Sequence, residues 1–156
     1  MIDILLAGAM AWQFVTERDP LGQPVYVAAV TPDPARPFVG VKYSCGGIVG
    51  VELQFNLGDA RYAASAFSTG EPPFETVRFA FPEGQYDTTA KRAPITEGIG
   101  TYEVKGSEAA FLAGLLKDSD KVTIQRGQNT FTFPLDGARF AISEVVSACP
   151  FKYEQN

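Results

Sequence analysis

The sequence contains no histidine and only two cysteines. These shortages exclude a zinc site built from histidine, a structural metal site rich in cysteine, and a catalytic triad that depends on histidine. Basic residues are also scarce: 13 Lys and Arg stand against 18 Asp and Glu, which gives a net charge of −5. A nucleic-acid-binding protein needs a basic face. We therefore expect no metal, no other cofactor and no nucleic acid among the ligands of this protein.

Short catalytic motifs are missing as well. The chain has no glycine-rich phosphate loop, no dinucleotide-binding G-x-G-x-x-G string and no G-x-S-x-G nucleophile turn. Without histidine, only a Ser–Lys pair could supply a nucleophile and its base, and Lys105 with Ser107 is the nearest such pair. Ser107 is better explained as a helix N-cap, and the neighbouring acids Asp118 and Asp120 are typical of a solvated turn. The sequence predicts a protein that is not an enzyme and has no catalytic residue.

The residues that are present suit one globular domain. The chain has 156 residues, of which 46% are apolar, and 12 Phe, six Tyr and one Trp supply material for a core. We assign residues 12–156 to a single β-rich domain and residues 1–11 to an apolar N-terminal segment.

That N-terminal segment allows two interpretations. It ends in Ala9-Met10-Ala11, which resembles the cleavage site of a secretory signal just before Trp12, although Asp3 occupies a position where a basic residue is usual. Alternatively, residues 1–11 are retained as an ordered docking segment. The segment is shorter than the roughly 20 apolar residues that cross a bilayer, so we expect no transmembrane span.

Alternation of apolar and polar residues with a period of two is the dominant pattern, and it predicts about seven strands. The clearest unit is a hairpin over Lys121–Leu135, connected by Gly127-Gln128-Asn129, with Pro134 placing its second strand at a sheet edge. The other predicted strands centre on Trp12–Phe14, Val25–Val30, Val51–Phe55, Val77–Phe81 and Tyr102–Lys105.

Two segments in the C-terminal third predict helices. Ser107 is the expected N-cap of the first, over Glu108–Lys117. Asp136 is the expected cap of the second, whose apolar stripe consists of Ile142, Val145, Val146 and Cys149. The expected fold is therefore mainly β: an antiparallel β-sandwich or barrel of about seven strands that carries two short helices.

Cys45 and Cys149 form no C-x-x-C motif, which excludes a thioredoxin-like redox site. They are either two buried free thiols in a cytosolic protein or one long-range disulfide in an exported protein. Cys45 precedes a predicted strand and Cys149 ends a predicted helix, and both positions would accommodate a cross-link.

The order of these features resembles a group of small exported β-sandwich proteins of Gram-negative bacteria. It includes the invasion-associated locus B family and the type VI secretion accessory proteins. The resemblance rests on Trp12, on Asp19–Gly22, on Val41–Cys45 and on the closing segment Gly137–Cys149. It implies a disulfide between Cys45 and Cys149, a periplasmic or extracellular location, and a binding or accessory role without a catalytic residue.

Aromatic and basic residues in predicted loops are the candidate partner-binding residues: Phe67, Phe74, Tyr86, Lys91 and Arg92. An edge strand such as Phe131–Leu135 could add affinity by pairing with a partner. We expect a non-enzymatic exported accessory protein that contacts a protein partner or an envelope component. The alternative is a structural subunit of a virion, a secretion machine or a membrane complex, with residues 1–11 as its docking segment.

Overall fold

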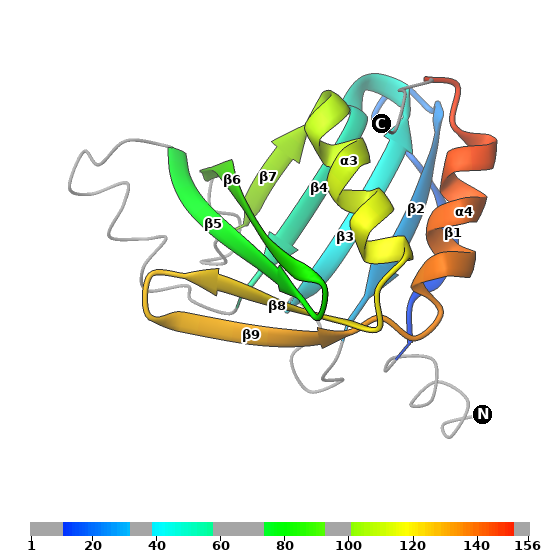
Figure 1. Ribbon diagram of the computed structural model, residues 1–156. Coiled ribbons are helices and arrows are strands. Elements are labelled where there is room, and N and C mark those ends of the chain that lie inside the picture. Colours follow the sequence, from blue (N-terminus) through cyan, green and yellow to red (C-terminus); the bar gives the residue numbers. More distant parts are fainter. Residues whose placement is uncertain (1–10, 32–38, 58–73, 93–100, 152–156) are drawn as a thin grey trace.

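The computed structural model describes residues 11–31, 39–57, 74–92 and 101–151. Within them, nine antiparallel strands form one sheet, and two α-helices pack on one of its faces (Figure 1). The strands are β1 (Gln13–Arg18), β2 (Pro24–Val30), β3 (Gly40–Gly46), β4 (Gly50–Asn56), β5 (Phe74–Phe81), β6 (Gly84–Arg92), β7 (Tyr102–Lys105), β8 (Lys121–Arg126) and β9 (Asn129–Pro134). The helices are α3 (Gly106–Lys117) and α4 (Ala138–Ala148), and a short 3-10 turn, η1 (Gly47–Val49), links β3 to β4.

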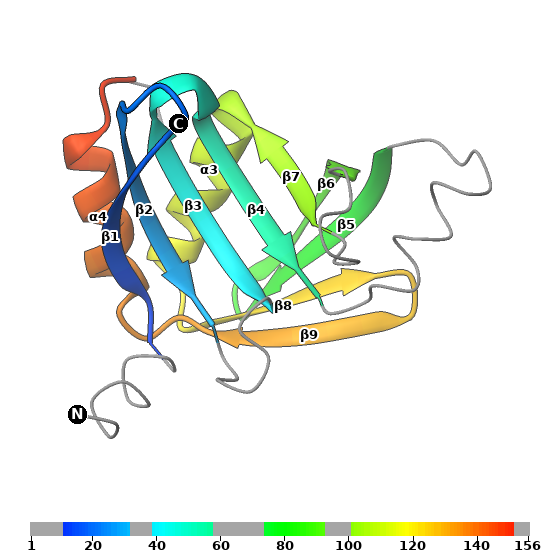
Figure 2. The ribbon, with the colours of Figure 1, turned by 180° about the vertical axis from the view of Figure 1, so that it is seen from behind.

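The strands follow the order β1-β2-β3-β4-β7-β6-β5-β8-β9, so the sheet is open and ends at β1 and β9. Strands β8 and β9 run across the lower end of the molecule at a steep angle to β3 and β4, and α3 lies inside this bend (Figure 1). The opposite face of β1 to β4 carries no helix (Figure 2). The mainly β fold with two C-terminal helices is thus confirmed. The finer prediction differs: one open sheet replaces the sandwich or barrel, and nine strands replace seven.

The core lies between the sheet and the two helices. Alternate residues of β3 and β4 point toward the helices, among them Val41, Tyr43, Leu53 and Phe55. The ring of Phe55 meets Phe79 edge-on, with 5.4 Å between ring centroids. Apolar burial of this kind contributes about 25 cal/mol for each Å² removed from water, so the sheet is stabilised mainly by its helix-covered face.

Both helices have N-caps that differ from the expected ones, by two residues in α3 and by one residue in α4. The N-cap of α3 is Lys105, and Ser107 lies inside the first turn, so the predicted Ser107 cap is wrong. The N-cap of α4 is Gly137, which has a φ of 79° that favours glycine. Asp136 is therefore not the cap; its carbonyl oxygen instead accepts a hydrogen bond of 2.9 Å from the backbone N–H of Trp12. Val146, expected in the buried stripe of α4, is 36% exposed.

The hairpin in the C-terminal third is confirmed with a shorter turn. Strands β8 and β9 are joined by Gly127 and Gln128 alone, because Arg126 pairs directly with Asn129. Gly127 takes a φ of 57°, as a two-residue turn requires. Pro134 ends β9 at the sheet edge, as predicted.

Cys45 of β3 and Cys149 at the end of α4 form a disulfide, with 5.5 Å between their Cα atoms. The bond joins residues 104 positions apart and connects the end of α4 to β3, the third strand from the β1 edge of the sheet. Of the two interpretations of the cysteines, free thiols or a disulfide, the structure therefore supports the disulfide. Neither helix in the described part of the chain has the length and apolar character needed to cross a membrane.

Candidate partner-binding groove

A groove of about 340 Å³ lies between the end of the β5–β6 hairpin and α3. We call it the hairpin–helix groove. Its apolar lining comes from Phe81, Tyr86, Phe111 and Leu115, and its polar lining from Glu83, Gly84, Gln85, Asp118 and Ser119. Phe81, Tyr86 and Leu115 pack against the core but remain only partly buried, and Phe111, also partly buried, packs against the ring of Tyr86. The groove is therefore a place where the core reaches the surface.

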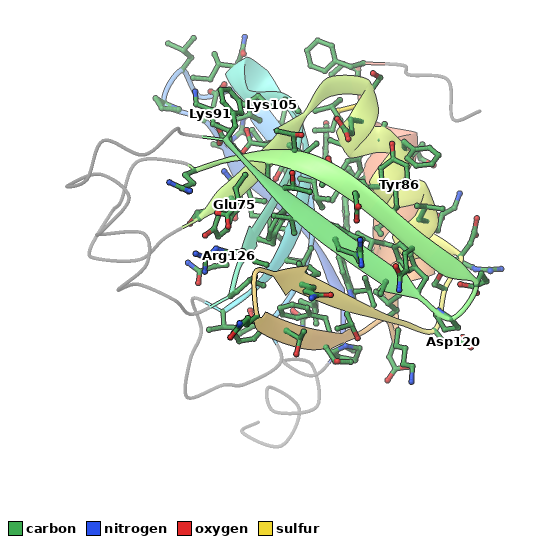
Figure 3. The ribbon with its side chains drawn as sticks, turned by 60° about the vertical axis from the view of Figure 1, so that its left-hand side comes forward. Glu75, Tyr86, Lys91, Lys105, Asp120 and Arg126 are labelled. Carbon is green, nitrogen blue, oxygen red and sulfur yellow. A yellow bond between two sulfur atoms is a disulfide. The ribbon has the colours of Figure 1, made fainter. Side chains whose placement is uncertain are left out.

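Strand register brings the hairpin side of the groove together. Phe79 pairs with Tyr86 and Phe81 pairs with Gly84, so Tyr86 and Phe81 point toward α3 with the core residues. The rings of Tyr86 and Phe111 lie 4.8 Å apart between centroids, at 50° to each other. Tyr86 lies beside α3 on this side of the sheet (Figure 3).

Gly84 leaves the groove open. It lies directly across from Phe81, and a Cβ added to Gly84 would meet no other heavy atom within 4 Å. A larger residue at this position would direct its side chain to the same face of the sheet as Phe81. The missing side chain thus accounts for part of the empty volume.

Carboxylates stand at the mouth of the groove. Glu83 comes from the β5–β6 turn and Asp118 from the end of α3, and the hydroxyl of Ser119 donates a hydrogen bond of 3.2 Å to Glu83. Arg139 approaches Asp118 to 3.6 Å, but both side chains are mostly exposed, and such pairs contribute little. Asp120 follows Ser119 at this end of the molecule (Figure 3). The charged residues that line the groove itself are all acidic.

Two of the predicted partner-binding residues lie together elsewhere. Phe74 and Lys91 face each other across β5 and β6, on the sheet face opposite the helices. They line a second depression of about 250 Å³ with Glu103, Lys105 and Glu108 among its other residues (Figure 3). This depression has equal numbers of acidic and basic residues, which gives it no net attraction for a charged partner.

One further carboxyl, Glu52, lies on the same sheet face beneath Lys105, with 3.8 Å between Lys105 Nζ and the carboxylate. Its side chain is only 5% exposed. Burial raises the pKa of Glu52 above its ordinary value, and the nearby charge of Glu103 raises it further, against the lowering effects of Lys105, Gln54 and Lys42.

Arg92 is buried in an ion-pair cluster on the helix side of the sheet. Its Nε donates to Glu75 at 3.3 Å, and Arg126 Nε donates to both oxygens of the same carboxylate at 3.1 and 3.2 Å. The guanidinium of Arg126 also lies 5.7 Å from the ring centroid of Tyr102. The cluster joins β5, β6 and β8, so these contacts give Arg92 a structural role.

The predicted loop location of these residues was wrong. Phe74 begins β5, while Tyr86, Lys91 and Arg92 lie on β6. Phe67 lies outside the described residues. Of the four candidates that the structure describes, only Tyr86 lines the hairpin–helix groove, and the binding role of Phe74 and Lys91 stays a prediction.

Sequence reasoning missed most of the groove. Phe111 and Leu115 were expected only as residues of the predicted helix Glu108–Lys117, and Phe81 only as the end of the predicted strand Val77–Phe81. The sequence did contain a signal: Phe81 and Tyr86 lie on either side of the turn at Pro82–Glu83. A hairpin with this turn brings both rings to the same face of the sheet.

Among the described residues, no group of three or more His, Cys, Asp or Glu side chains is arranged to hold a metal ion. No family model, curated protein or solved structure matches the chain.

Proposed function

We propose that this protein is an exported accessory protein without enzymatic activity, and that it binds a segment of another protein in the hairpin–helix groove. The bound segment presents an apolar side chain to Phe81, Tyr86, Phe111 and Leu115, and a Lys or Arg next to it meets the carboxylates at the mouth. The observation that carries the proposal is the groove itself, in which apolar side chains line a space with an acidic rim.

The apolar lining supports a side-chain anchor. Full burial of a Leu, Phe or Met side chain contributes about 1.5–3 kcal/mol, and aromatic residues dominate the energetics of protein interfaces. At about 340 Å³, the groove lies near the lower end of the size range of ligand pockets, roughly 300–1,000 Å³. A single apolar anchor suits this volume.

The rim supports a basic neighbour to that anchor. Glu83 and Asp118 stand on opposite walls, so a cation at the mouth can lie near either carboxylate. Exposed charges chiefly raise association rates and give salt-dependent affinity. The interaction should therefore weaken as the salt concentration rises.

The disulfide supports export. Disulfides persist in oxidising compartments such as the periplasm and are rare in the cytosol, where thiols are kept reduced. The intact mass of the natively produced protein tests this part of the proposal: the mature chain should lack residues 1–11 and two hydrogen atoms. An intact N-terminus with free thiols would instead favour the structural-subunit alternative.

A displayed library of random peptides tests the groove, with binding of selected peptides measured by fluorescence anisotropy. The enriched peptides should share an apolar residue next to Lys or Arg. Gly84→Leu, whose Cβ meets no other heavy atom within 4 Å, should direct its side chain into the groove and weaken binding at least about tenfold, the equivalent of roughly 1.4 kcal/mol. Gly84→Ala adds only a Cβ and should have a smaller effect.

The charge requirement is tested separately with Asp118→Lys and Glu83→Lys. Each should weaken binding and reduce its dependence on salt. The matched control is Glu144→Lys, which makes the same charge change at an exposed position of α4 outside the groove. Selected peptides that bind Gly84→Leu as tightly as the native protein, or that contain no common basic residue, would contradict the proposal.

A further inference from the structure

The outer edge of β9 has features of a strand that accepts another strand. Its sequence, Asn129–Pro134, contains no charged residue and is rich in Thr and Phe, which favour strands. Natural edge strands are commonly protected by charges, and the other edge strand, β1, contains Glu17 and Arg18. Within the described segments, no strand pairs with the outer side of β9.

The hairpin register shows which backbone groups point outward. In a two-residue hairpin, the residues that flank the turn exchange both backbone hydrogen bonds, and every second pair along the ladder does the same. Arg126 and Asn129 flank the turn, so the next hydrogen-bonded residue of β9 is Phe131. The N–H and C=O groups of Thr130 and Thr132 therefore point away from β8. The hydroxyls of Thr132 and Thr123 lie 2.9 Å apart, as expected for the closer, non-hydrogen-bonded type of pair.

The far end of β9 is closed to pairing. Pro134 has no N–H group, and its carbonyl oxygen accepts a hydrogen bond of 2.9 Å from Nε1 of Trp12. The outward-facing groups available to a new strand are thus those of Thr130 and Thr132, placed symmetrically about Phe131.

We propose that two copies of this chain associate through β9, in an antiparallel arrangement with the twofold axis at Phe131. Thr130 of one copy then faces Thr132 of the other, and each of these two pairs exchanges two backbone hydrogen bonds. Phe131 faces its own counterpart, so the two rings lie on the same side of the joined sheet. The two sheets become one continuous sheet.

A second copy fits this edge because the edge is complementary to itself. The two outward residues exchange places under the twofold axis, and no like charges face each other across the new pair. Pairing of one short strand covers less area than the roughly 1,200–2,000 Å² typical of stable complexes. The dimer is therefore weak and forms at high local concentration.

Sedimentation velocity from about 1 μM to about 1 mM tests the association, because this range brackets weak binding. The native protein should shift from monomer to dimer within it. Thr132→Pro removes one outward N–H and the hydroxyl contact with Thr123 but no backbone hydrogen bond to β8, and it should raise the dissociation constant at least tenfold. Thr132→Val is the matched control, since it loses the same hydroxyl but keeps the N–H group, and it should still dimerise.

Cross-linking tests the register. Cysteines introduced by Phe131→Cys should form a disulfide between copies, because non-hydrogen-bonded partners lie about 4.5 Å apart between Cα atoms. Cysteines from Thr130→Cys are offset along the strands and should not. The proposal is overturned if the native protein stays monomeric over the whole concentration range, or if Thr132→Pro and Thr132→Val associate equally. A monomeric native protein would indicate that β9 pairs with a strand of a different protein. Unfolded variants are recognised by the fluorescence of Trp12, the chain's single tryptophan.

Discussion

Glu52 is a carboxyl group at a position where its charged form is poorly solvated. Desolvation and the neighbouring charge of Glu103 raise its pKa more than Lys105, Gln54 and Lys42 lower it. The folded protein therefore binds the proton of Glu52 more tightly than the unfolded chain does. The contribution of Glu52 to stability is fully present below about pH 4.5, the ordinary value, and is lost as the pH rises through the higher pKa of the folded state.

We accordingly expect Glu52→Gln to be more stable than the native protein at pH 7, because glutamine stays neutral. The difference should vanish below about pH 4.5, where the native carboxyl is protonated in both states. Urea unfolding at pH 4, 5.5 and 7, followed by Trp12 fluorescence, measures this difference in the free energy of unfolding. The control is Glu144→Gln, which makes the same change at an exposed position. A variant that is less stable at pH 7 would show that the contacts of Glu52 with Lys105 and Gln54 outweigh its desolvation.

Among the elements, β6 shows why part of the fold escaped sequence analysis. The residues of β6 that face the helices are Tyr86, Thr88, Ala90 and Arg92, so the apolar alternation that marks a strand is missing. Thr88 is accommodated there because it donates a hydrogen bond to Glu108 of α3, and Arg92 because it meets Glu75. These partners lie far along the chain and have no local signature.

The hairpin β8–β9 and both helices were predictable because their patterns are local. β3 was predictable in principle, since Val41, Tyr43 and Cys45 alternate, but Cys45 was expected just before a strand, whereas it lies within β3. The groove was only partly predictable: Tyr86 was identified, whereas its approach to Phe111 depends on how α3 crosses the sheet.

We expect the ion-pair cluster of Glu75, Arg92 and Arg126 to stabilise the packing of strands β5, β6 and β8 on one another. Glu75→Gln should lower the free energy of unfolding by about 3 kcal/mol, because two buried guanidinium groups lose the charge that compensates them. The matched control is Asp87→Asn, which removes the partner of Arg78 on the exposed face and should cost less than about 1 kcal/mol. Chemical unfolding of both variants measures the difference, and equal losses would refute a structural role for the cluster.

In the whole molecule, the disulfide connects the end of β3 to the end of α4. The double variant Cys45→Ala/Cys149→Ala should lose about 2–4 kcal/mol of stability, because a loop of this length is unconstrained in its unfolded chain. Urea unfolding of the oxidised protein and of the variant gives the loss. An unchanged unfolding midpoint would mean that packing of α4 alone fixes the C-terminal end.

The hydrogen bonds of Trp12 with the carbonyl groups of Pro134 and Asp136 link the start of the described chain to a segment more than 120 residues later. A polypeptide that leaves a ribosome N-terminus first cannot form these hydrogen bonds, or join Cys45 to Cys149, until residues 134–149 have emerged. Strands β1 to β4 are consecutive and can pair as each one emerges, but α4, the last of the described elements, joins them only at the end. The complete structure, with α4 fixed against β1 and β3, therefore forms only after the segment up to residue 149 has been synthesised.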